Sequence, residues 1–342
     1  MRYDVAIVGA GPSGASTAKH CAEKGLKVII IEKKVQLGYP SHCAGYIPKL
    51  VSRYFRIPRA CVQQKIKRMA TFFPSGKIKF TSMHGFIVDR SLFDKFLCLQ
   101  ALDAGAEIVV GGSVIALKEK TLKVMVKNKK IDIKADFIVG ADGALSKVAR
   151  WMGFNRPNLI KCAQYEVHNI TGIEEETAET YFDLNLTKAY AWIYPCGNSS
   201  AKVGIGTINE NPVKKLNLFM KIVPKLRNTN VYSIYSGFIP IRKSLALGKK
   251  HVLLVGDAAG VTDAISGAGI LSGIISGKAA SKAIAMNDIE VYHKSIKKIL
   301  GKRLKRALLK REILNRLKSN SELEKELPKV WIAFKDYWRN EK

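Results

Sequence analysis

The apolar positions at the start of the chain fall into two short runs with a helical pattern between them. Residues 5–8 form a continuous apolar run, and the glycine-rich segment 9–14 (GAGPSG) follows at once. Small apolar residues then recur at helical spacing, and a second apolar run ends in Glu32. This pattern predicts a strand, a tight turn, a helix and a second, parallel strand.

Alternation between strand-like and helix-like patterns continues up to about residue 155. Two strand-like runs within 68–82 flank the turn residues 74–76 (PSG) and predict a hairpin. An amphipathic helix is expected up to about Asp103, with Asp89 or Ser91 as its cap. The other elements expected in this part are a strand over 106–116, two short strands around a Lys-Asn-Lys turn, a strand over 135–139 and a helix over 145–152.

Residues 158 to about 241 follow a different pattern, in which apolar and polar positions alternate. Such alternation predicts antiparallel strands with one covered face. The earlier pattern returns at 251–260, where a strand ends in Gly-Asp, and a helix is expected over 267–286. The predicted fold class is therefore α/β: a Rossmann-like parallel sheet, an inserted antiparallel β-rich domain and a helical C-terminal tail.

The glycine turn carries the first chemical signal. Gly9 permits a sharp turn, Gly11 lets the backbone approach a pyrophosphate, and Gly14 lets the helix pack closely on the sheet. The N–H groups at the helix start favour phosphate binding. Glu32, at the tip of the second strand, can accept hydrogen bonds from ribose hydroxyls. An ordinary glycine turn is the alternative, but the strand–turn–helix context with a following acid favours binding of a dinucleotide's adenosine end.

Three further positions suggest contact with a ligand. Arg90 lies at a helix start, where the helix dipole disfavours a cation, so it is expected to reach an anion such as a phosphate. A surface arginine is the alternative. Asp257 follows a predicted strand and can accept the hydroxyl protons of a polyol. Cys43 lies in a loop of small residues, where a lone cysteine often acts only as a small hydrophobic residue.

The net charge of the 342-residue chain is +29, which favours acidic partners. These could be nucleic acid, an anionic membrane surface or an acidic protein; a lysine-rich source with a solvated surface would explain part of the excess. Much of the charge lies in the segment 292–342, where leucines and isoleucines recur at helical spacing. We expect an amphipathic basic helix that binds a membrane surface. Alternatively, its apolar stripe packs on the rest of the protein. The cations are Lys294, Lys297, Lys298, Lys302, Arg303, Lys305, Arg306, Lys310, Arg311, Arg316 and Lys318.

The six cysteines are scattered, without a CxxC pair or a Cys/His cluster, so neither a zinc site nor a disulfide framework is expected. Residue 1 is followed almost directly by a predicted strand, which leaves no room for a signal peptide. No apolar run approaches the length that spans a bilayer. We expect a cytoplasmic protein, peripheral on the inner face of the cell membrane. Binding of nucleic acid by the tail is not favoured, because aromatic residues for base stacking are few there.

Five segments together resemble a known family. The turn 9–14 with Glu32, the segment 140–143 (GADG) and the segment 256–260 (GDAAG) are similar to the three FAD fingerprints of the p-hydroxybenzoate-hydroxylase-like flavoproteins. Within that fold, 40–45 (PSHCAG) and 190–197 (YAWIYPCG) resemble the geranylgeranyl reductase family. The resemblance covers about residues 1–290. It departs from the family where Ala264 follows Asp263 and where Ala268 interrupts a glycine cluster. Both changes keep the backbone N–H donors and bear only on the rigidity of that loop.

The resemblance implies non-covalently bound FAD and a division into domains. The FAD-binding domain would comprise 1–60, 90–155 and 246–290, the substrate-binding β domain 61–89 and 156–245, and the basic tail 291–342. The implied FAD contacts are Gly9, Gly11, Ser13, Gly14, Glu32, Cys43, Ala44, Tyr46, Arg90, Val114, Asp257, Gly269 and Ile270. The implied walls of the substrate cavity are Tyr190, Trp192 and Tyr194.

The activity implied by the resemblance is the saturation of isoprenoid double bonds in archaeal-type lipids. An unactivated alkene must be protonated as the hydride arrives, so a general acid is needed beside the flavin. Cys43 is the first candidate and Tyr46 the second. The alternative role of Cys43 is packing against the flavin ring. The electron donor would be NAD(P)H or a ferredoxin, because the sequence holds no second Rossmann unit. Other activities compatible with this scaffold are a monooxygenase acting on an aromatic or quinone substrate and an electron-transfer flavoprotein for membrane quinone.

Overall fold

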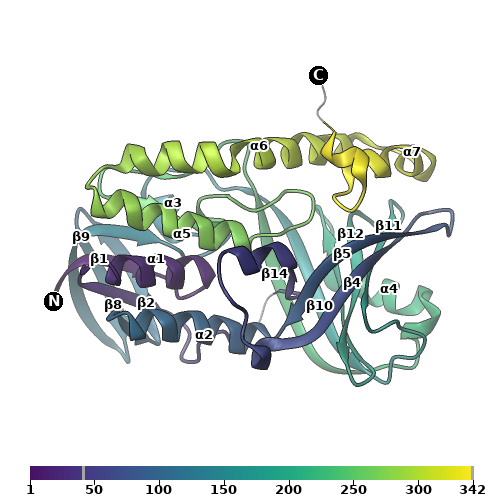
Figure 1. The fold of residues 1–342 in the computed structure, drawn as a ribbon, viewed down its shortest axis with the longest axis horizontal. Helices are drawn as coiled ribbons and strands as arrows, with labels where there is room; N and C mark the ends of the chain where they lie inside the picture. Colours follow the sequence, from purple (N-terminus) through teal and green to yellow (C-terminus); the bar gives the residue numbers. More distant parts are fainter. Residues whose placement is uncertain (41–42, 340–342) are drawn as a thin grey trace.

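The computed structural model describes residues 1–40 and 43–339 and contains two large sheets, each partly covered by helices (Figure 1). The strands of the first sheet are β1 (Arg2–Val8), β2 (Val28–Glu32), β6 (Glu107–Val110), β7 (Gly112–Lys118), β8 (Thr121–Val126), β9 (Lys129–Gly140), β15 (Gly248–Lys249) and β16 (Val252–Leu254). Their order is β15-β16-β9-β1-β2-β6, and β8 joins β7 to β9.

The centre of this sheet is parallel, as the sequence predicts. Strand β1 pairs in parallel with both β2 and β9, so that Val8 lies beside Ile31 on one side and Gly140 on the other. Helix α1 (Pro12–Ala22) follows β1 directly. The predicted order of strand, turn, helix and parallel strand is confirmed, and it brings the carboxyl ends of the central strands to one edge.

Four long helices pack as a layer on this sheet. In Figure 1, α6 (Ile289–Arg316), α5 (Ile270–Ala285), α1 and α2 (Arg90–Asp103) follow one another from top to bottom. Asp89, and not Ser91, caps α2, because its carboxylate accepts the N–H groups of Ser91 and Leu92. Helix α3 (Lys147–Trp151) is shorter than the expected 145–152, since Ser146 caps it and residues 143–146 form a turn.

The second sheet holds the segment predicted to be antiparallel. Its strands are β3 (Tyr46–Pro48), β4 (Val62–Phe72), β5 (Ile78–Val88), β10 (Asn158–His168), β11 (Thr177–Asp183), β12 (Thr187–Gly197), β13 (Ser200–Thr207) and β14 (Asn230–Ile241). Their order is β14-β10-β13-β12-β11-β4-β5-β3. The hairpin expected within 68–82 is confirmed as β4 and β5. One pair, β4 with β11, is parallel.

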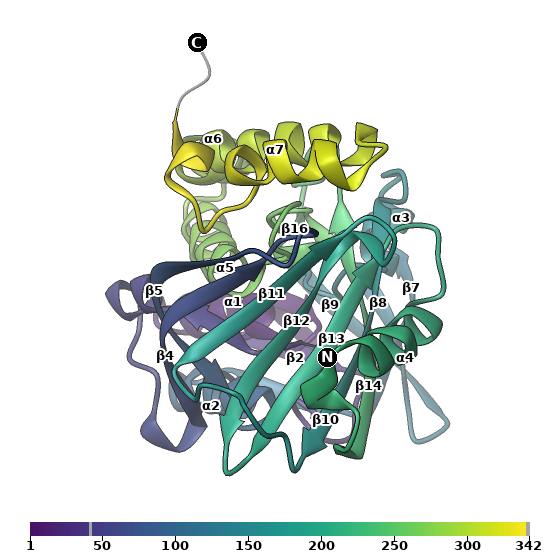
Figure 2. The same ribbon diagram turned by 90° about the vertical axis from the view of Figure 1, so that its right-hand side faces the viewer.

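Short elements complete this half of the molecule. Helix α4 (Pro212–Ile222) packs on the sheet beside β10 and β13, and Figure 2 shows α6 and α7 (Asn320–Val330) across one end of the strands. Strand β3 lies within the segment expected to belong to the FAD-binding domain, yet it pairs with β5 of the second sheet. The 3-10 helices are η1 (Lys49–Arg53), η2 (Arg59–Cys61), η3 (Pro224–Leu226), η4 (Gly256–Ala258) and η5 (Lys335–Trp338).

The strand expected over 106–116 is interrupted, which corrects the sequence prediction. Gly111 adopts a φ of 69°, a left-handed conformation that turns the chain between β6 and β7. Strand β6 then pairs in parallel with β2, whereas β7 pairs in the antiparallel sense with β8. Hydrophobic alternation could not reveal this break, because apolar residues continue on both sides of the glycine.

The basic tail forms α6, α7 and η5, and residues 340–342 lie outside the described residues. Its apolar stripe packs on the protein, since Ile296, Leu300 and Leu314 are buried. The expectation of one continuous cationic face is wrong at two positions: Lys310 is 3% and Arg311 1% exposed. Among the described residues, no helix is both long and apolar enough to cross a bilayer.

The contact between α6 and the first sheet can be tested at Tyr292. Its side chain is fully buried, and its hydroxyl donates to the carbonyl of Leu254 at 2.6 Å. Replacing Tyr292 by Phe leaves that carbonyl without its partner, so the free energy of unfolding should fall by about 1–3 kcal/mol. Urea denaturation measures this loss. Tyr54→Phe is the control, because Tyr54 is 49% exposed, and it should leave the midpoint unchanged.

Candidate functional site

One cavity of about 790 Å³ is lined by residues of both sheets. The glycine turn after β1, the end of β2 and the loop before α5 contribute from the first sheet. Strands β10, β12 and β14 contribute from the second. A ligand that enters this cavity therefore touches both halves of the molecule.

The three glycines of the turn have distinct surroundings. Gly9 has a φ of 104°, and a Cβ there would overlap the carbonyl oxygen of Ala141. A Cβ at Gly14 would overlap the carbonyl oxygen of Gly9, so the absent side chain allows α1 to approach the sheet. Gly11 lines the cavity, and apart from its chain neighbours no residue has an atom within 4 Å of the position its Cβ would occupy. The space at Gly11 is therefore open to a ligand.

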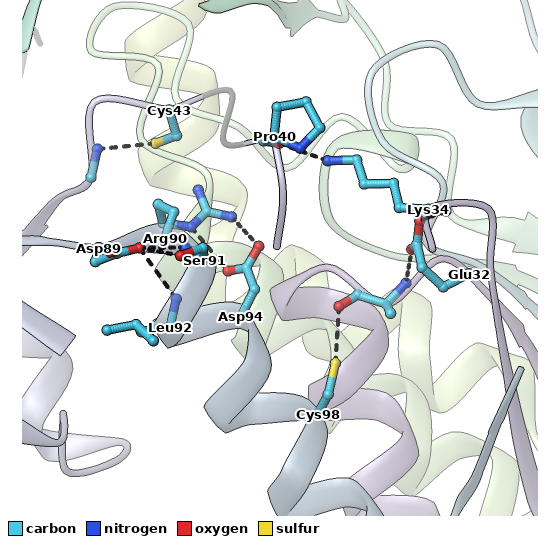
Figure 3. Close-up of polar contacts among 12 residues, drawn as sticks. Glu32, Lys34, Pro40, Cys43, Asp89, Arg90, Ser91, Leu92, Asp94 and Cys98 are labelled. Carbon is cyan, nitrogen blue, oxygen red and sulfur yellow. Dashed lines mark hydrogen bonds and ion pairs between the residues drawn. The ribbon is translucent and has the colours of Figure 1, made fainter. Parts of the chain in front are cut away.

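Glu32 is held rigidly at the end of β2. One carboxylate oxygen accepts the N–H of Ala10 at 2.8 Å, and the other accepts the N–H of Lys34 at 2.8 Å. Figure 3 shows this arrangement, with the thiol of Cys98 donating to the carbonyl of Ala10. Each carboxylate oxygen has a second lone pair, so Glu32 can still accept a hydrogen bond from a hydroxyl of a ligand in the cavity.

A second acid lies where the chain leaves β16. Asp257, in η4, is partly buried, lines the cavity and accepts a hydrogen bond from the hydroxyl of Thr262. Burial raises the pKa of Asp257 above its usual value, although the hydrogen bond from Thr262 opposes the shift. Gly269 and Ile270 stand beside it at the start of α5, where the first N–H groups of a helix have no partner within the helix.

Arg90, at the start of α2, also lines the cavity. Its guanidinium forms two bonds with Asp94, Nε to Oδ1 at 3.0 Å and Nη2 to Oδ2 at 2.9 Å (Figure 3). It also reaches the sulfur of Cys43. Burial lowers the pKa of Arg90, but the Asp94 carboxylate and the Cys43 sulfur outweigh burial and raise it overall. The anion expected beside Arg90 is, within the protein, Asp94.

Strand β12 supplies an aromatic wall. Tyr190, Trp192 and Tyr194 all line the cavity. The hydroxyl of Tyr190 donates to the carbonyl of Ser266 at 2.7 Å, and the indole N–H of Trp192 donates to Gln164 at 3.3 Å. The polar atoms of these two rings are thus bound by the protein, which leaves ring surface to face a ligand.

Most of the residues singled out from the sequence converge on this cavity. Gly14 and Tyr46 do not line it. Gly14 packs between α1 and the sheet, and Tyr46 in β3 donates its hydroxyl to Met83 and lies 6.0 Å from Tyr194 between ring centroids. The lining residues among those expected are Gly9, Gly11, Ser13, Glu32, Cys43, Ala44, Arg90, Val114, Tyr190, Trp192, Tyr194, Asp257, Gly269 and Ile270.

Sequence reasoning missed several residues of the wall. Asp94 could have been found, because it lies four positions after Arg90 on a predicted helix, where side chains of opposite charge meet. Cys162, Gln164 and Tyr235 belong to β10 and β14, whose register with each other had no visible signal. Ser266 enters only because its loop folds back towards Tyr190.

The residues that line the cavity have the chemistry that FAD binding requires. Gly11 leaves room where a pyrophosphate would approach the start of α1, and Glu32 offers a fixed carboxylate at the ribose position. Asp257 offers an acceptor for hydroxyls elsewhere in the cavity. Phosphates near a helix start, and hydroxyls near carboxylates, are the contacts that a dinucleotide requires.

Comparison with known proteins agrees with this fit. Residues 4–72 match the family described as FAD dependent oxidoreductase, and residues 158–238 match the geranylgeranyl reductase catalytic domain. A flavin-dependent brominase of known structure superposes with a TM-score of 0.73 over 92% of this chain and 88% of its own. At 17% identity it shows the shared fold alone. The protein is thus an FAD-dependent oxidoreductase.

Closer relatives define the family. The chain is 33% identical to a digeranylgeranylglycerophospholipid reductase from Methanothrix thermoacetophila, covering 95% of this chain and 90% of the relative. It is 32% identical to the enzyme of that name from Methanosarcina acetivorans, covering 92% and 86%. A geranylgeranyl bacteriochlorophyll reductase-like protein from Thermoplasma acidophilum superposes with a TM-score of 0.90 at 27% identity, covering 96% and 91%. The chain belongs to the geranylgeranyl reductase family.

The different surroundings of Gly11 and Gly14 give a test of the site. Gly11→Ala should leave the free energy of unfolding of the apoprotein nearly unchanged but weaken FAD binding, because the new methyl group enters the cavity. Gly14→Ala should destabilise the apoprotein itself, because its Cβ overlaps Gly9. FAD titration followed by fluorescence, together with thermal unfolding, separates the two effects.

Gly301→Ala is the control, since a Cβ there meets only the flexible side chain of Lys297 at 3.7 Å. It should change neither quantity. Equal FAD affinity in Gly11→Ala and the unmodified protein would contradict the assignment of Gly11 to the pyrophosphate position.

Proposed function

We propose that this chain is an FAD-dependent reductase that saturates double bonds in geranylgeranyl chains of archaeal-type lipids. The observation that carries the proposal is that the dinucleotide turn and the aromatic wall of β12 line the same cavity. The names of the relatives and the match of 158–238 to the reductase catalytic domain support the substrate class. The first sheet would serve as the FAD-binding domain and the second as the substrate-binding domain.

When bound and reduced, FAD supplies the hydride. The chain must then supply the proton, because an isoprenoid alkene has no carbonyl to activate it. We assign the proton donor to Cys43, which lines the cavity, and not to Tyr46, which does not. Burial also raises the pKa of Tyr46 to about 12, which makes it a weak acid.

Arg90 gives Cys43 an environment suited to this role. The Arg90 guanidinium reaches the sulfur of Cys43, and a neighbouring cation stabilises the thiolate that remains once a thiol has given up its proton. Asp94 holds the guanidinium in place by its two bonds. Burial raises the pKa of Cys162, the second thiol that lines the cavity, to about 12.

The aromatic wall suits an isoprenoid chain. Tyr190 and Trp192 direct their polar hydrogen atoms to protein acceptors, so their faces offer apolar surface to the substrate. Excluding water here would also protect the positive character that develops on the alkene. Packing within the core is the simpler role of these rings, and it is compatible with contact to the substrate.

Reduction and product analysis test the proposed function. The purified flavoprotein is reduced anaerobically, mixed with a geranylgeranyl glycerophospholipid and analysed by mass spectrometry. We expect products heavier by pairs of hydrogen atoms. Oxygenated product in air, without saturated product under anaerobic conditions, would favour a monooxygenase. Oxidation of the flavin by a quinone without change in the lipid would favour an electron-transfer flavoprotein.

The role of Cys43 gives a separate prediction. Cys43→Ala should keep bound FAD but lower the rate of alkene reduction by about 10²–10⁴-fold, the usual contribution of a general acid. Cys162→Ala removes a thiol of the same cavity whose pKa is raised, and it should cause a much smaller loss. Single-turnover oxidation of the reduced flavin by the lipid measures both. Near-normal turnover of Cys43→Ala would leave Cys43 with a packing role.

The electron donor and the membrane are the remaining partners. We propose NAD(P)H or an acidic ferredoxin as donor; the net charge of +29 suits the latter. We also propose that the enzyme is cytoplasmic and binds the inner face of the membrane through exposed lysines of α6. Each cation near an anionic surface contributes about 1 kcal/mol within a Debye length. The lysines are Lys294, Lys297, Lys298, Lys302 and Lys305.

Vesicle sedimentation tests this surface. The protein should bind vesicles that contain anionic lipid, bind neutral vesicles weakly and dissociate at high salt. Changing the five lysines of α6 to Gln should abolish binding. The control changes five exposed lysines of β7, β8, β9 and their turns, and it should retain most of the binding: Lys118, Lys123, Lys127, Lys129 and Lys130. Equal effects of both sets would show that total charge, and not α6, governs binding.

A further inference from the structure

Arg311, a cation of the basic tail, points into the protein and not towards solvent. Arg311 is 1% exposed and directs its guanidinium at three backbone carbonyls. Nε donates to Ala264 at 2.8 Å, Nη1 to Lys188 at 3.0 Å and Nη2 to Ile265 at 3.2 Å. Burial lowers the pKa of Arg311 to about 10, so the group remains charged at neutral pH. Because the guanidinium is planar and rigid, three carbonyls that accept from it are held in fixed positions relative to one another.

The carbonyls of Ala264 and Ile265 belong to the loop that connects β16 to α5. Asp263, 2% exposed, organises the same loop from within: its Oδ1 accepts the N–H groups of Ile265 and Ser266. Its Oδ2 lies 3.7 Å from Nε of Arg303, which is also on α6. Two arginines of one helix thus contact this loop, one through carbonyls and one through a carboxylate.

The other side of the loop forms the cavity wall. Thr262, Ser266, Gly267 and Gly269 line the cavity, and the carbonyl of Ser266 accepts the hydroxyl of Tyr190. Three successive carbonyls, 264 to 266, are therefore held by side chains from α6 and β12. The N–H groups that open α5 follow directly, and their direction depends on how this loop is held.

We propose that Arg311 is a positioning residue for the flavin: by binding two carbonyls of the loop and one of β12, it fixes the loop that leads to the first N–H groups of α5, which we assign to the cofactor. Ala264 and Ala268 leave the backbone of the loop without the restraint of a proline, so its rigidity must come from outside contacts. The planar guanidinium supplies a fixed geometry for three acceptors at once, which a lysine cannot reproduce. Arg303 supports the same loop through Asp263.

The test uses the full chain with FAD and needs no lipid, so its result is independent of the proposed substrate. Arg311→Lys and Arg311→Met are compared by FAD dissociation constant, by the midpoint potential of the bound flavin and by the melting temperature of the apoprotein. Both variants should raise the dissociation constant about tenfold or more, the loss expected when a charge-assisted hydrogen bond is removed. Both should also lower the midpoint potential, because misdirected N–H groups stabilise the reduced ring less.

Two further variants sharpen the experiment. Arg316→Met removes one charge from an exposed position of α6 and should change neither the dissociation constant nor the potential. Arg303→Met acts on the solvent side of the loop, where the arginine is 34% exposed, and should give a smaller change in the same direction. It provides a measurement even if the Arg311 variants fail to fold.

Several results would overturn the proposal. Arg311→Lys with the affinity and potential of the unmodified protein would show that charge alone matters, and not the fork of three bonds. A lower melting temperature with unchanged affinity and potential would reduce Arg311 to a packing role. If only Arg303→Met can be purified, an unchanged dissociation constant and potential in that variant would also exclude the positioning of the flavin by α6.

Discussion

The close approach of helix α1 to the central strands is the constraint on which the cavity depends. A side chain at Gly14 would meet the carbonyl of Gly9, and a side chain at Gly9 would meet Ala141 at the end of β9. Because neither exists, α1 begins immediately beyond β1 and directs its first N–H groups along the edge where the parallel strands end. Glu32, on the neighbouring strand, is then brought to Ala10 and held by its N–H.

The second sheet lies against this edge, and the two sheets together form the cavity. Strands β10, β12 and β14 face the ends of the parallel strands, so an aromatic wall stands opposite a polar one. On the polar side, charges are paired locally, as Arg90 is with Asp94. On the aromatic side, the hydroxyl of Tyr190 and the indole N–H of Trp192 donate hydrogen bonds to acceptors of the protein. The division suits a reaction in which a charged cofactor must meet an apolar chain.

The basic tail has an exposed side and a buried side, and the two sides have different roles. Its outward lysines carry the charge that a membrane surface or an acidic protein could recognise. Its inward side contributes apolar residues to the core and two arginines to the loop before α5. The sequence pattern of α6 predicts a surface helix, but α6 also supports the cavity wall. The buried Arg311 donates to carbonyls of the loop before α5, and the partly exposed Arg303 contacts the carboxylate of Asp263.

Local patterns sufficed for the parallel core, the glycine turn and the hairpin β4–β5, since these depend on residues close in sequence. The cavity residues Tyr190, Trp192, Tyr194, Gly269 and Ile270 were expected from the family resemblance, and other lining residues of β10 and β14 were not predicted at all. The fold alone decided three other features. Gly111 breaks a run of apolar residues, Tyr46 joins the second sheet outside the cavity, and Arg311 is buried among carbonyls of distant segments. Such placements depend on which segments meet in space, and hydrophobic periodicity reports only which face of an element is covered.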